Sequence, residues 1–194
     1  MLDQNDRIRD ANLLKKYHKS LVYDYTEYPT KGNWDHSFGS QQYQDSLKDW
    51  ISKNPKKPIL FYVHTPFCEQ LCWFCLCSKE ITQDYERVKK YLYDYLFKEI
   101  DMLFNFLEKN NLKLNVKEIY FGGGSPTYYK NAEFEKLTEK LKSSFDFSQV
   151  GDWSVEIDPR RVDEEKLLFY KNCGVNRISF GVQDFDSVVQ KKIN

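Results

Sequence analysis

The sequence has no excess of charge of either sign, because 29 lysines and arginines balance 29 aspartates and glutamates among 194 residues. Surfaces that bind nucleic acid or anionic membranes carry a basic excess, so neither partner is expected. No apolar run approaches the ~20 residues that span a bilayer, and the residues after Met1 are polar, unlike a signal peptide. These absences predict a cytoplasmic protein.

The common phosphate-binding motifs, internal repeats and low-complexity segments are also missing. The glycine-rich turn Gly122-Gly-Gly-Ser125 is followed by no Lys-Ser or Lys-Thr pair, and no G-x-G-x-x-G occurs. A phosphate site is therefore not expected there. The backbone amides of this turn could still approach the polar groups of another ligand closely.

Cysteines are few but clustered, since Cys68, Cys72, Cys75 and Cys77 lie within ten residues. In a reducing compartment such spacing favours metal or redox chemistry over disulfides. Thiolates on one short loop can hold an iron–sulfur cluster, and zinc on all four cysteines is the alternative. Cys77 follows Cys75 by only two residues, which strains four-point tetrahedral closure and favours the cluster. The fifth cysteine, Cys173, is expected to be a core residue.

Hydrophobic periodicity predicts alternating strands and helices from residue 58 onward. The strands are expected at 59–64, 116–121, 153–158 and 175–183, and the helices at 85–107, 134–145 and 163–172. This order predicts an α/β fold with a parallel sheet, either doubly wound or a section of a barrel. The first strand is expected to be buried on both faces.

Residues 1–57 are polar and irregular, with a short helix expected near Asn12–Lys19. This segment is too polar to form a core of its own. We therefore expect two parts: an N-terminal segment, 1–57, that packs over the residues that follow, and a core, 58–194.

Candidate site residues follow the predicted strands. In parallel sheets, loops at the carboxyl ends of strands carry the chemistry, and the cysteine loop, Gly122–Ser125, Glu156 and Gln183 all fall there. A buried carboxylate at Glu156 needs a partner, which is either a ligand hydroxyl or amino group or a basic residue such as Arg177.

Alternation along the first strand places Tyr62 and His64 on the same side, next to the cysteine loop. His64 is either a hydrogen-bonded core histidine or a ligand-facing residue, and the sequence does not separate the two.

Several segments together resemble the oxygen-independent coproporphyrinogen III oxidases, a radical S-adenosylmethionine (SAM) family. They are Tyr62–Cys77 with its C-x3-C-x2-C spacing, Gly122–Thr127, Ser154–Arg160, Ser179–Phe185 and the upstream Tyr28-Pro29-Thr30. The resemblance implies the first four strands of an open parallel (βα)6 barrel, preceded by an irregular N-terminal segment, residues 1–57, that packs near the active site. It also implies oxidative decarboxylation of two propionates of coproporphyrinogen III to vinyl groups, giving protoporphyrinogen IX.

The resemblance further implies a 4Fe–4S cluster and two SAM molecules. The implied cluster ligands are Cys68, Cys72 and Cys75. The implied contacts to the cluster-bound SAM are Tyr62, Gly123 and Glu156, and those to the second SAM are Phe74, Gly124, Ser125 and Gln183. Cys77 matches an additional cysteine that is not a ligand but is associated with activity, and His64 is the second catalytic candidate.

An electron donor such as reduced flavodoxin and a monomeric state are also implied. Two alternatives remain: a haem chaperone of the same superfamily and a zinc-binding module. Cys77 and Tyr28-Pro29-Thr30 favour the oxidase over the chaperone. Enzymes of the family are more than twice as long, so we expect the 194-residue chain alone to expose an unpaired sheet edge and to be poorly stable and inactive.

Overall fold

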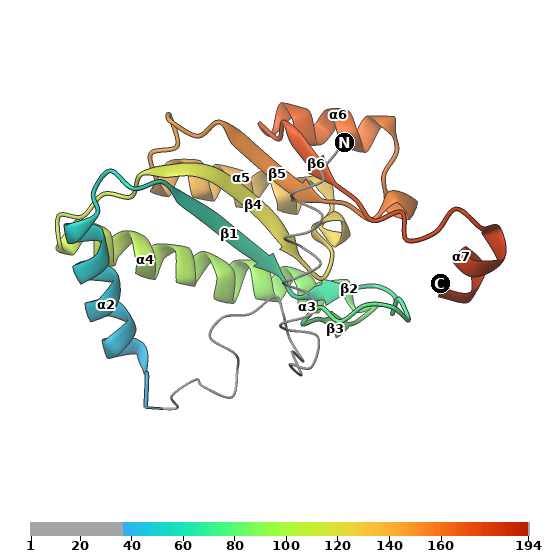
Figure 1. The fold of residues 1–194 in the computed structure, drawn as a ribbon, viewed down its shortest axis with the longest axis horizontal. Helices are drawn as coiled ribbons and strands as arrows, with labels where there is room; N and C mark the ends of the chain where they lie inside the picture. Colours follow the sequence, from blue (N-terminus) through green and yellow to red (C-terminus); the bar gives the residue numbers. More distant parts are fainter. Residues whose placement is uncertain (1–36, 194) are drawn as a thin grey trace, which may run out of the picture. The chain divides into compact units, whose positions relative to one another are not determined.

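The computed structural model describes residues 37–193 (Figure 1). The chain divides into two compact units, residues 1–45 and 46–194, and the second contains the sheet and its covering helices. Helix α2 (Ser40–Lys53) begins in the first unit and ends in the second, where its Ile51 is buried.

Two sequence-based expectations, the helix near Asn12–Lys19 and the Tyr28-Pro29-Thr30 segment, lie outside the described residues. The boundary at residue 57 stays a prediction. In the part of the chain that the structure describes, no helix combines the length and the apolar character needed to cross a membrane.

Within residues 46–193, four parallel strands form the main sheet, in the order β1-β4-β5-β6. The strands are β1 (Ile59–Thr65), β4 (Val116–Gly123), β5 (Asp152–Glu156) and β6 (Arg177–Ser179). Each new strand is added beside the previous one, so the winding never reverses. A doubly wound sheet would reverse its order, and the observed order is therefore that of a barrel section.

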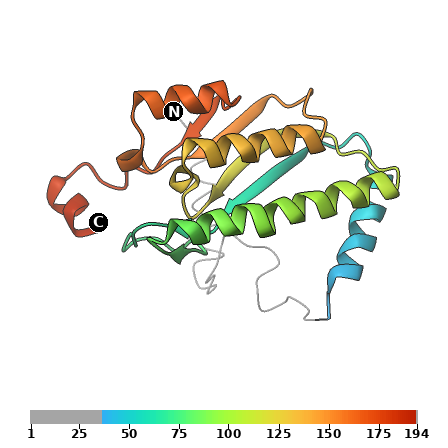
Figure 2. The same ribbon diagram turned by 180° about the vertical axis from the view of Figure 1, so that it is seen from behind.

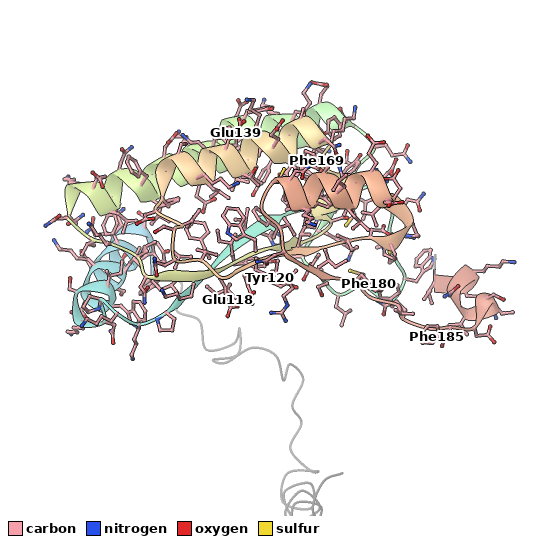
Figure 3. The ribbon with its side chains drawn as sticks, turned by 90° about the horizontal axis from the view of Figure 1, so that it is seen from above. Glu118, Tyr120, Glu139, Phe169, Phe180 and Phe185 are labelled. Atoms are coloured by element: carbon pink, nitrogen blue, oxygen red, sulfur yellow. The ribbon has the colours of Figure 1, made fainter. Side chains whose placement is uncertain are left out.

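Helices pack on one face of the sheet (Figures 1 and 2). They are α3 (Tyr85–Lys90), α4 (Phe97–Lys109), α5 (Asn131–Ser144) and α6 (Glu164–Asn172). The short 3-10 turns η3 (Pro126–Tyr128) and η4 (Pro159–Arg161) follow β4 and β5, and α7 (Ser187–Ile193), which has no buried residue, lies beyond the end of the sheet (Figure 1). Figure 3 shows α4, α5 and α6 on one side, while Glu118 and Tyr120 of β4 point away from them. The one-sided cover agrees with the barrel-like winding.

One continuous helical stretch, residues 85–109, follows the cysteine loop and confirms the long amphipathic helix expected at 85–107. Its middle is a π-helical segment, η2 (Tyr91–Leu96), between α3 and α4. Asp84 caps its start by accepting a hydrogen bond from the backbone N–H of Glu86. The side chains that it buries recur at intervals of four or seven residues: Val88, Leu92, Leu96, Ile100 and Leu107.

The core lies between the sheet and these helices, and Phe134 of α5 is at its centre. The Phe134 ring is fully buried and lies 5.1 Å from the Phe121 ring of β4 and 4.7 Å from the Tyr170 ring of α6, between centroids. Aromatic pairs at such separations add to the free energy of burial. The Phe134 side chain of α5 thus contacts both the sheet and α6.

The expectation that the first strand is buried on both faces is wrong. Leu60 and Tyr62 of β1 are 50% and 49% exposed, whereas Val63 and Thr65 are buried. The reason is the one-sided helix cover: alternate residues of β1 face the described helices, and the intervening ones face the open side.

The fourth strand is shorter than the predicted 175–183. Strand β6 ends at Ser179, whose carbonyl accepts the last ladder hydrogen bond from the Ile157 N–H (2.8 Å). Gln183 has φ of +63°, in the left-handed region that an extended strand does not use. The chain therefore leaves the sheet after Ser179 and passes over its carboxyl end.

Candidate cofactor site at the carboxyl ends of the strands

A cavity of about 640 Å³ lies where the strands end, within the ~300–1,000 Å³ typical of small-molecule sites. It brings together most of the residues singled out in the sequence. Those that line it are Cys68, Cys72, Phe74, Cys75, Cys77, Gly123, Gly124, Ser125, Glu156 and Gln183. The expectation that these segments lie together at the carboxyl ends of the strands is therefore confirmed.

The cysteine loop is closed by a short parallel ladder. Strand β2 (Phe67–Cys68) pairs with β3 (Glu80–Ile81), and the Thr82 N–H donates to the Cys68 carbonyl at 3.0 Å. Lys79 adds a second tie, because its ammonium donates to the carbonyls of Cys75 (3.0 Å) and Cys77 (3.2 Å). The ladder and the lysine hold the loop against the cavity.

The four loop thiols lie within electrostatic reach of one another. Burial, followed by the charges of Cys75 and Cys72, raises the pKa of the Cys68 thiol to about 11. Burial opposes ionisation of Cys75 too, but hydrogen bonds from the backbone and thiol of Cys77 hold the Cys75 pKa below its ordinary value. Among residues 37–193, no three His, Cys, Asp or Glu side chains are gathered closely enough to hold a metal ion. The donor set, rather than a preformed cage, is what suits a soft metal centre.

The backbone N–H groups of the glycine turn donate hydrogen bonds to other parts of the chain, whereas we expected them to approach a ligand. The Gly123 N–H donates to Glu156 Oε2 (3.2 Å), the Gly124 N–H to the Thr65 carbonyl (2.6 Å) and the Ser125 N–H to the Phe67 carbonyl (2.9 Å). The expectation that these amides face a ligand is wrong, because they join β4 to β5 and to the entry of the cysteine loop. Ligand contacts from this turn must come from other atoms.

Close backbone approach explains the glycines. A Cβ on Gly124 would lie 2.7 Å from the Phe67 carbonyl oxygen, and one on Gly123 would lie 2.6 Å from the His64 ring. Gly123 also has φ of +112°, which side-chain-bearing residues rarely adopt.

We expect Gly123→Ala to destabilise the fold. Strain from the positive φ alone costs about 1–3 kcal/mol, and the contacts with His64 and the Thr65 carbonyl add to it. The free energy of unfolding in urea measures the loss. Gly151→Ala is the matched control, since a Cβ there meets no atom within 4 Å. Equal stability of the two variants would contradict this account of the turn.

Glu156 ends β5 with its carboxylate held on two sides. Oε1 accepts from the Tyr120 hydroxyl at 2.9 Å and Oε2 from the Gly123 N–H at 3.2 Å. Burial and then the hydrogen bond to Glu156 raise the pKa of Tyr120, so this phenol stays a donor. Arg177, the basic alternative considered from the sequence, instead pairs with Asp152 (3.6 Å). The carboxylate is thus oriented by neutral donors while it lines the cavity.

Tyr62 and His64 lie side by side as expected, but neither lines the cavity. The Tyr62 hydroxyl lies 3.1 Å from His64 Nδ1, and His64 Nε2 lies 3.2 Å from the Ser78 carbonyl. A carbonyl can only accept, so Nε2 carries the proton and Nδ1 accepts from Tyr62. The Nε2 hydrogen bond thus joins β1 to the end of the cysteine loop, and the Nδ1 hydrogen bond lies within β1.

Asp158, Arg160 and Arg161 also line the cavity, and the sequence assigned no role to them. Arg160 and Arg161 form part of η4, directly after β5, and Arg161 makes an ion pair with Glu69 of the cysteine loop. The signal in the sequence was the pair of arginines that follows Asp158-Pro159. Their partners, however, are remote in sequence, so the pattern alone did not assign them. Cys173 is buried, as expected of a core residue.

Comparison with known proteins agrees with this geometry. A family model described as the radical SAM superfamily matches residues 62–194. The oxygen-independent coproporphyrinogen III oxidase of Pseudomonas aeruginosa is 36% identical over 192 residues, which are 97% of this chain and 40% of that protein. The enzyme of the same name from Escherichia coli is 35% identical over 185 residues, 95% of this chain and 38% of that protein.

A solved structure of coproporphyrinogen III oxidase from Escherichia coli, described as a radical SAM enzyme, is also similar. Its TM-score is 0.76 at 34% sequence identity, with 90% of this chain and 38% of that chain covered. This chain therefore spans about two fifths of the length of the curated relatives that it matches.

Proposed function

The chain belongs to the radical SAM superfamily, and from that premise we propose that its cavity is the cofactor site of an oxygen-independent coproporphyrinogen III oxidase. The proposed reaction is the oxidative decarboxylation of two propionates of coproporphyrinogen III to vinyl groups, giving protoporphyrinogen IX. One observation carries the proposal: a single cavity at the strand ends is lined by Cys68, Cys72 and Cys75 together with Glu156. The names of the relatives supply the substrate class.

The residues of this cavity fit a 4Fe–4S cluster. Cys68, Cys72 and Cys75 supply three thiolates from one short loop, and thiolates are the usual protein ligands of such clusters. Three ligands leave one iron for SAM. When bound, the cluster and SAM supply the 5′-deoxyadenosyl radical that removes a hydrogen atom from the substrate propionate. The part of the chain is to hold, orient and shield these groups.

Glu156 is proposed to bind the cluster-bound SAM. Because Tyr120 and Gly123 fix the carboxylate, its remaining lone pairs can accept from an amino group or a ribose hydroxyl without reorganisation. Gly123 and Tyr62 are proposed to contact the same SAM molecule. Gly123 lines the cavity, and the hydroxyl of Tyr62 is oriented by its hydrogen bond to His64.

A second SAM is proposed to contact Phe74, Gly124, Ser125 and Gln183. All four line the same cavity as the cysteines. Phe74 is half exposed, so its ring is available to stack on a ligand. Gln183 has a positive φ, so the backbone there does not continue the extended conformation of strand β6.

Cys77 and His64 are the proposed catalytic residues. Cys77 is exposed, lines the cavity and is not one of the three ligands, so its thiol is available to a substrate. His64 has both nitrogens engaged within the chain, and in this arrangement it would act by holding Tyr62 and the Ser78 end of the cysteine loop.

The proposed partners are coproporphyrinogen III and a one-electron donor such as reduced flavodoxin, with the protein acting as a cytoplasmic monomer. Residues 1–57 are proposed to pack near the active site, as the family resemblance implies.

Binding of SAM to the anaerobically reconstituted protein tests the proposal, and Glu156→Gln tests its main contact. A hydrogen bond to a charged group contributes about 1.5–3 kcal/mol, so we expect SAM affinity to fall by about 10- to 100-fold. Equilibrium dialysis with labelled SAM gives the dissociation constant. Glu118→Gln is the matched control, because Glu118 is an exposed carboxylate of β4 outside the cavity lining. A wild-type protein that holds a cluster but does not bind SAM would overturn the proposal.

The haem chaperone is the second candidate function, and it makes a distinct prediction. It requires tight haem binding without SAM cleavage. Cys77 is exposed in the cavity, and its presence favours the oxidase because the chaperones generally lack this cysteine. Haem binding in place of SAM binding would favour the chaperone.

A further inference from the structure

Arg160 is held rigidly by the residue two positions before it. Its Nε donates to Asp158 Oδ1 (2.9 Å) and its Nη2 to Asp158 Oδ2 (2.8 Å), which is the two-pronged pairing that guanidinium and carboxylate geometry favours. The Arg160 backbone N–H also donates to Asp158 Oδ1, at 3.0 Å. These hydrogen bonds hold the Asp158 pKa below its ordinary value against the effect of burial. Asp158 thus stays an anion that fixes the guanidinium.

The fixed guanidinium reaches the cysteine loop. Arg160 Nη2 donates to the sulfur of Cys72 at 3.3 Å, across 88 positions of sequence. The neighbouring Arg161 pairs with Glu69, three residues before Cys72. Two consecutive side chains of η4 therefore contact the same loop, one at a sulfur and one at a carboxylate.

We propose that Arg160, oriented by Asp158, is a positioning residue that raises the reduction potential of the cluster by donating a hydrogen bond to the Cys72 sulfur. This inference rests on the proposed function, because it assigns Cys72 as a ligand. Reduction adds negative charge to the cluster and its thiolates. A cationic donor at a ligand sulfur stabilises the reduced form more than the oxidised form, and hydrogen bonds to sulfur are among the factors that set cluster potentials.

Arginine suits this position better than lysine. Its guanidinium stays charged at every relevant pH, and its planar fork can hold Asp158 and Cys72 at once. A lysine would keep the positive charge but lose the fixed direction of the hydrogen bond. The two effects can therefore be separated by substitution.

The test is an anaerobic redox titration of the reconstituted protein, with the reduced cluster followed by electron paramagnetic resonance. For Arg160→Met we expect the ratio of reduced to oxidised cluster at a given potential to fall about tenfold, which is a shift of about 59 mV to more negative potential for a one-electron couple. Arg160→Lys should shift the potential in the same direction by less. Arg87→Met is the matched control, because Arg87 pairs with Glu80 and does not line the cavity; it should match the wild type.

The outcomes distinguish this inference from the proposed function. A wild-type protein that assembles no 4Fe–4S cluster overturns both. A wild-type protein with a cluster, and an Arg160→Met cluster of unchanged potential, overturns the inference alone. A purely structural role of Arg160 would lower the amount of cluster without moving its potential. If Arg160→Met holds no cluster, the potential of Arg160→Lys decides the question, and no shift there also overturns the inference.

Discussion

Replacing Cys72 with alanine is expected to leave the reconstituted protein without a 4Fe–4S cluster. The loop supplies only three proposed ligands, so the loss of one leaves the cluster with two protein thiolates. The wild type should bind about four irons and four sulfides per chain and show the broad visible absorption of such a cluster. Cys68→Ala and Cys75→Ala should behave as Cys72→Ala does. Iron and sulfide analysis together with the visible spectrum gives the result.

Cys77→Ala and Cys173→Ala are the matched controls for this loss. Cys77 lines the same cavity without being a proposed ligand, and Cys173 is buried in the core away from the loop. Both variants should keep the iron and sulfide of the wild type. A zinc module makes the opposite prediction: colourless protein with about one zinc per chain, and loss of metal in Cys77→Ala as well. That pattern would contradict the radical SAM assignment of the loop.

Phe134→Ala is expected to cost about 3–5 kcal/mol of the free energy of unfolding, as for other large buried aromatics. The ring is fully buried, and it packs on Phe121 of β4 and Tyr170 of α6. Its removal leaves a cavity between the sheet and two helices that these rigid elements cannot readily fill. A urea titration followed by circular dichroism measures the loss.

Phe185→Ala is the control for the same chemical change. Phe185 is 90% exposed and lies on the chain that follows β6 (Figure 3). Its loss should change the free energy of unfolding by no more than about 0.5 kcal/mol. Similar losses at the two positions would contradict the placement of the core around Phe134.

The long helix and the alternation of strands and helices along the chain were predicted well because each depends on local pattern. Val88, Leu92 and Ile100 recur on one face of a helix whatever surrounds it. Alternating strands and helices in turn favour parallel pairing with crossovers. The pattern could not show that the helices cover one face only, since this depends on the direction of winding. For that reason Leu60 and Tyr62 were wrongly expected to be buried.

The sequence predicted which residues line the candidate site but not which residues they hydrogen-bond to. The cysteine spacing and the strand ends place Cys68, Glu156 and Gln183 at one edge of the sheet, and the cavity brings them together. The glycine turn was correctly located, but its amides serve the backbone rather than a ligand. Glycine permits close approach, and the sequence does not say what approaches it.

The sequence by itself determined the cysteine-rich loop, the parallel α/β fold and the family, because thiol spacing, hydrophobic period and turn residues act over a few positions. Only the tertiary structure decided that Glu156 is held by Tyr120 and Gly123, and that Arg160 reaches Cys72. Such contacts join residues tens of positions apart, and they form only after hydrophobic burial has aligned the strands. Their geometry therefore follows from packing of the whole unit rather than from any one segment.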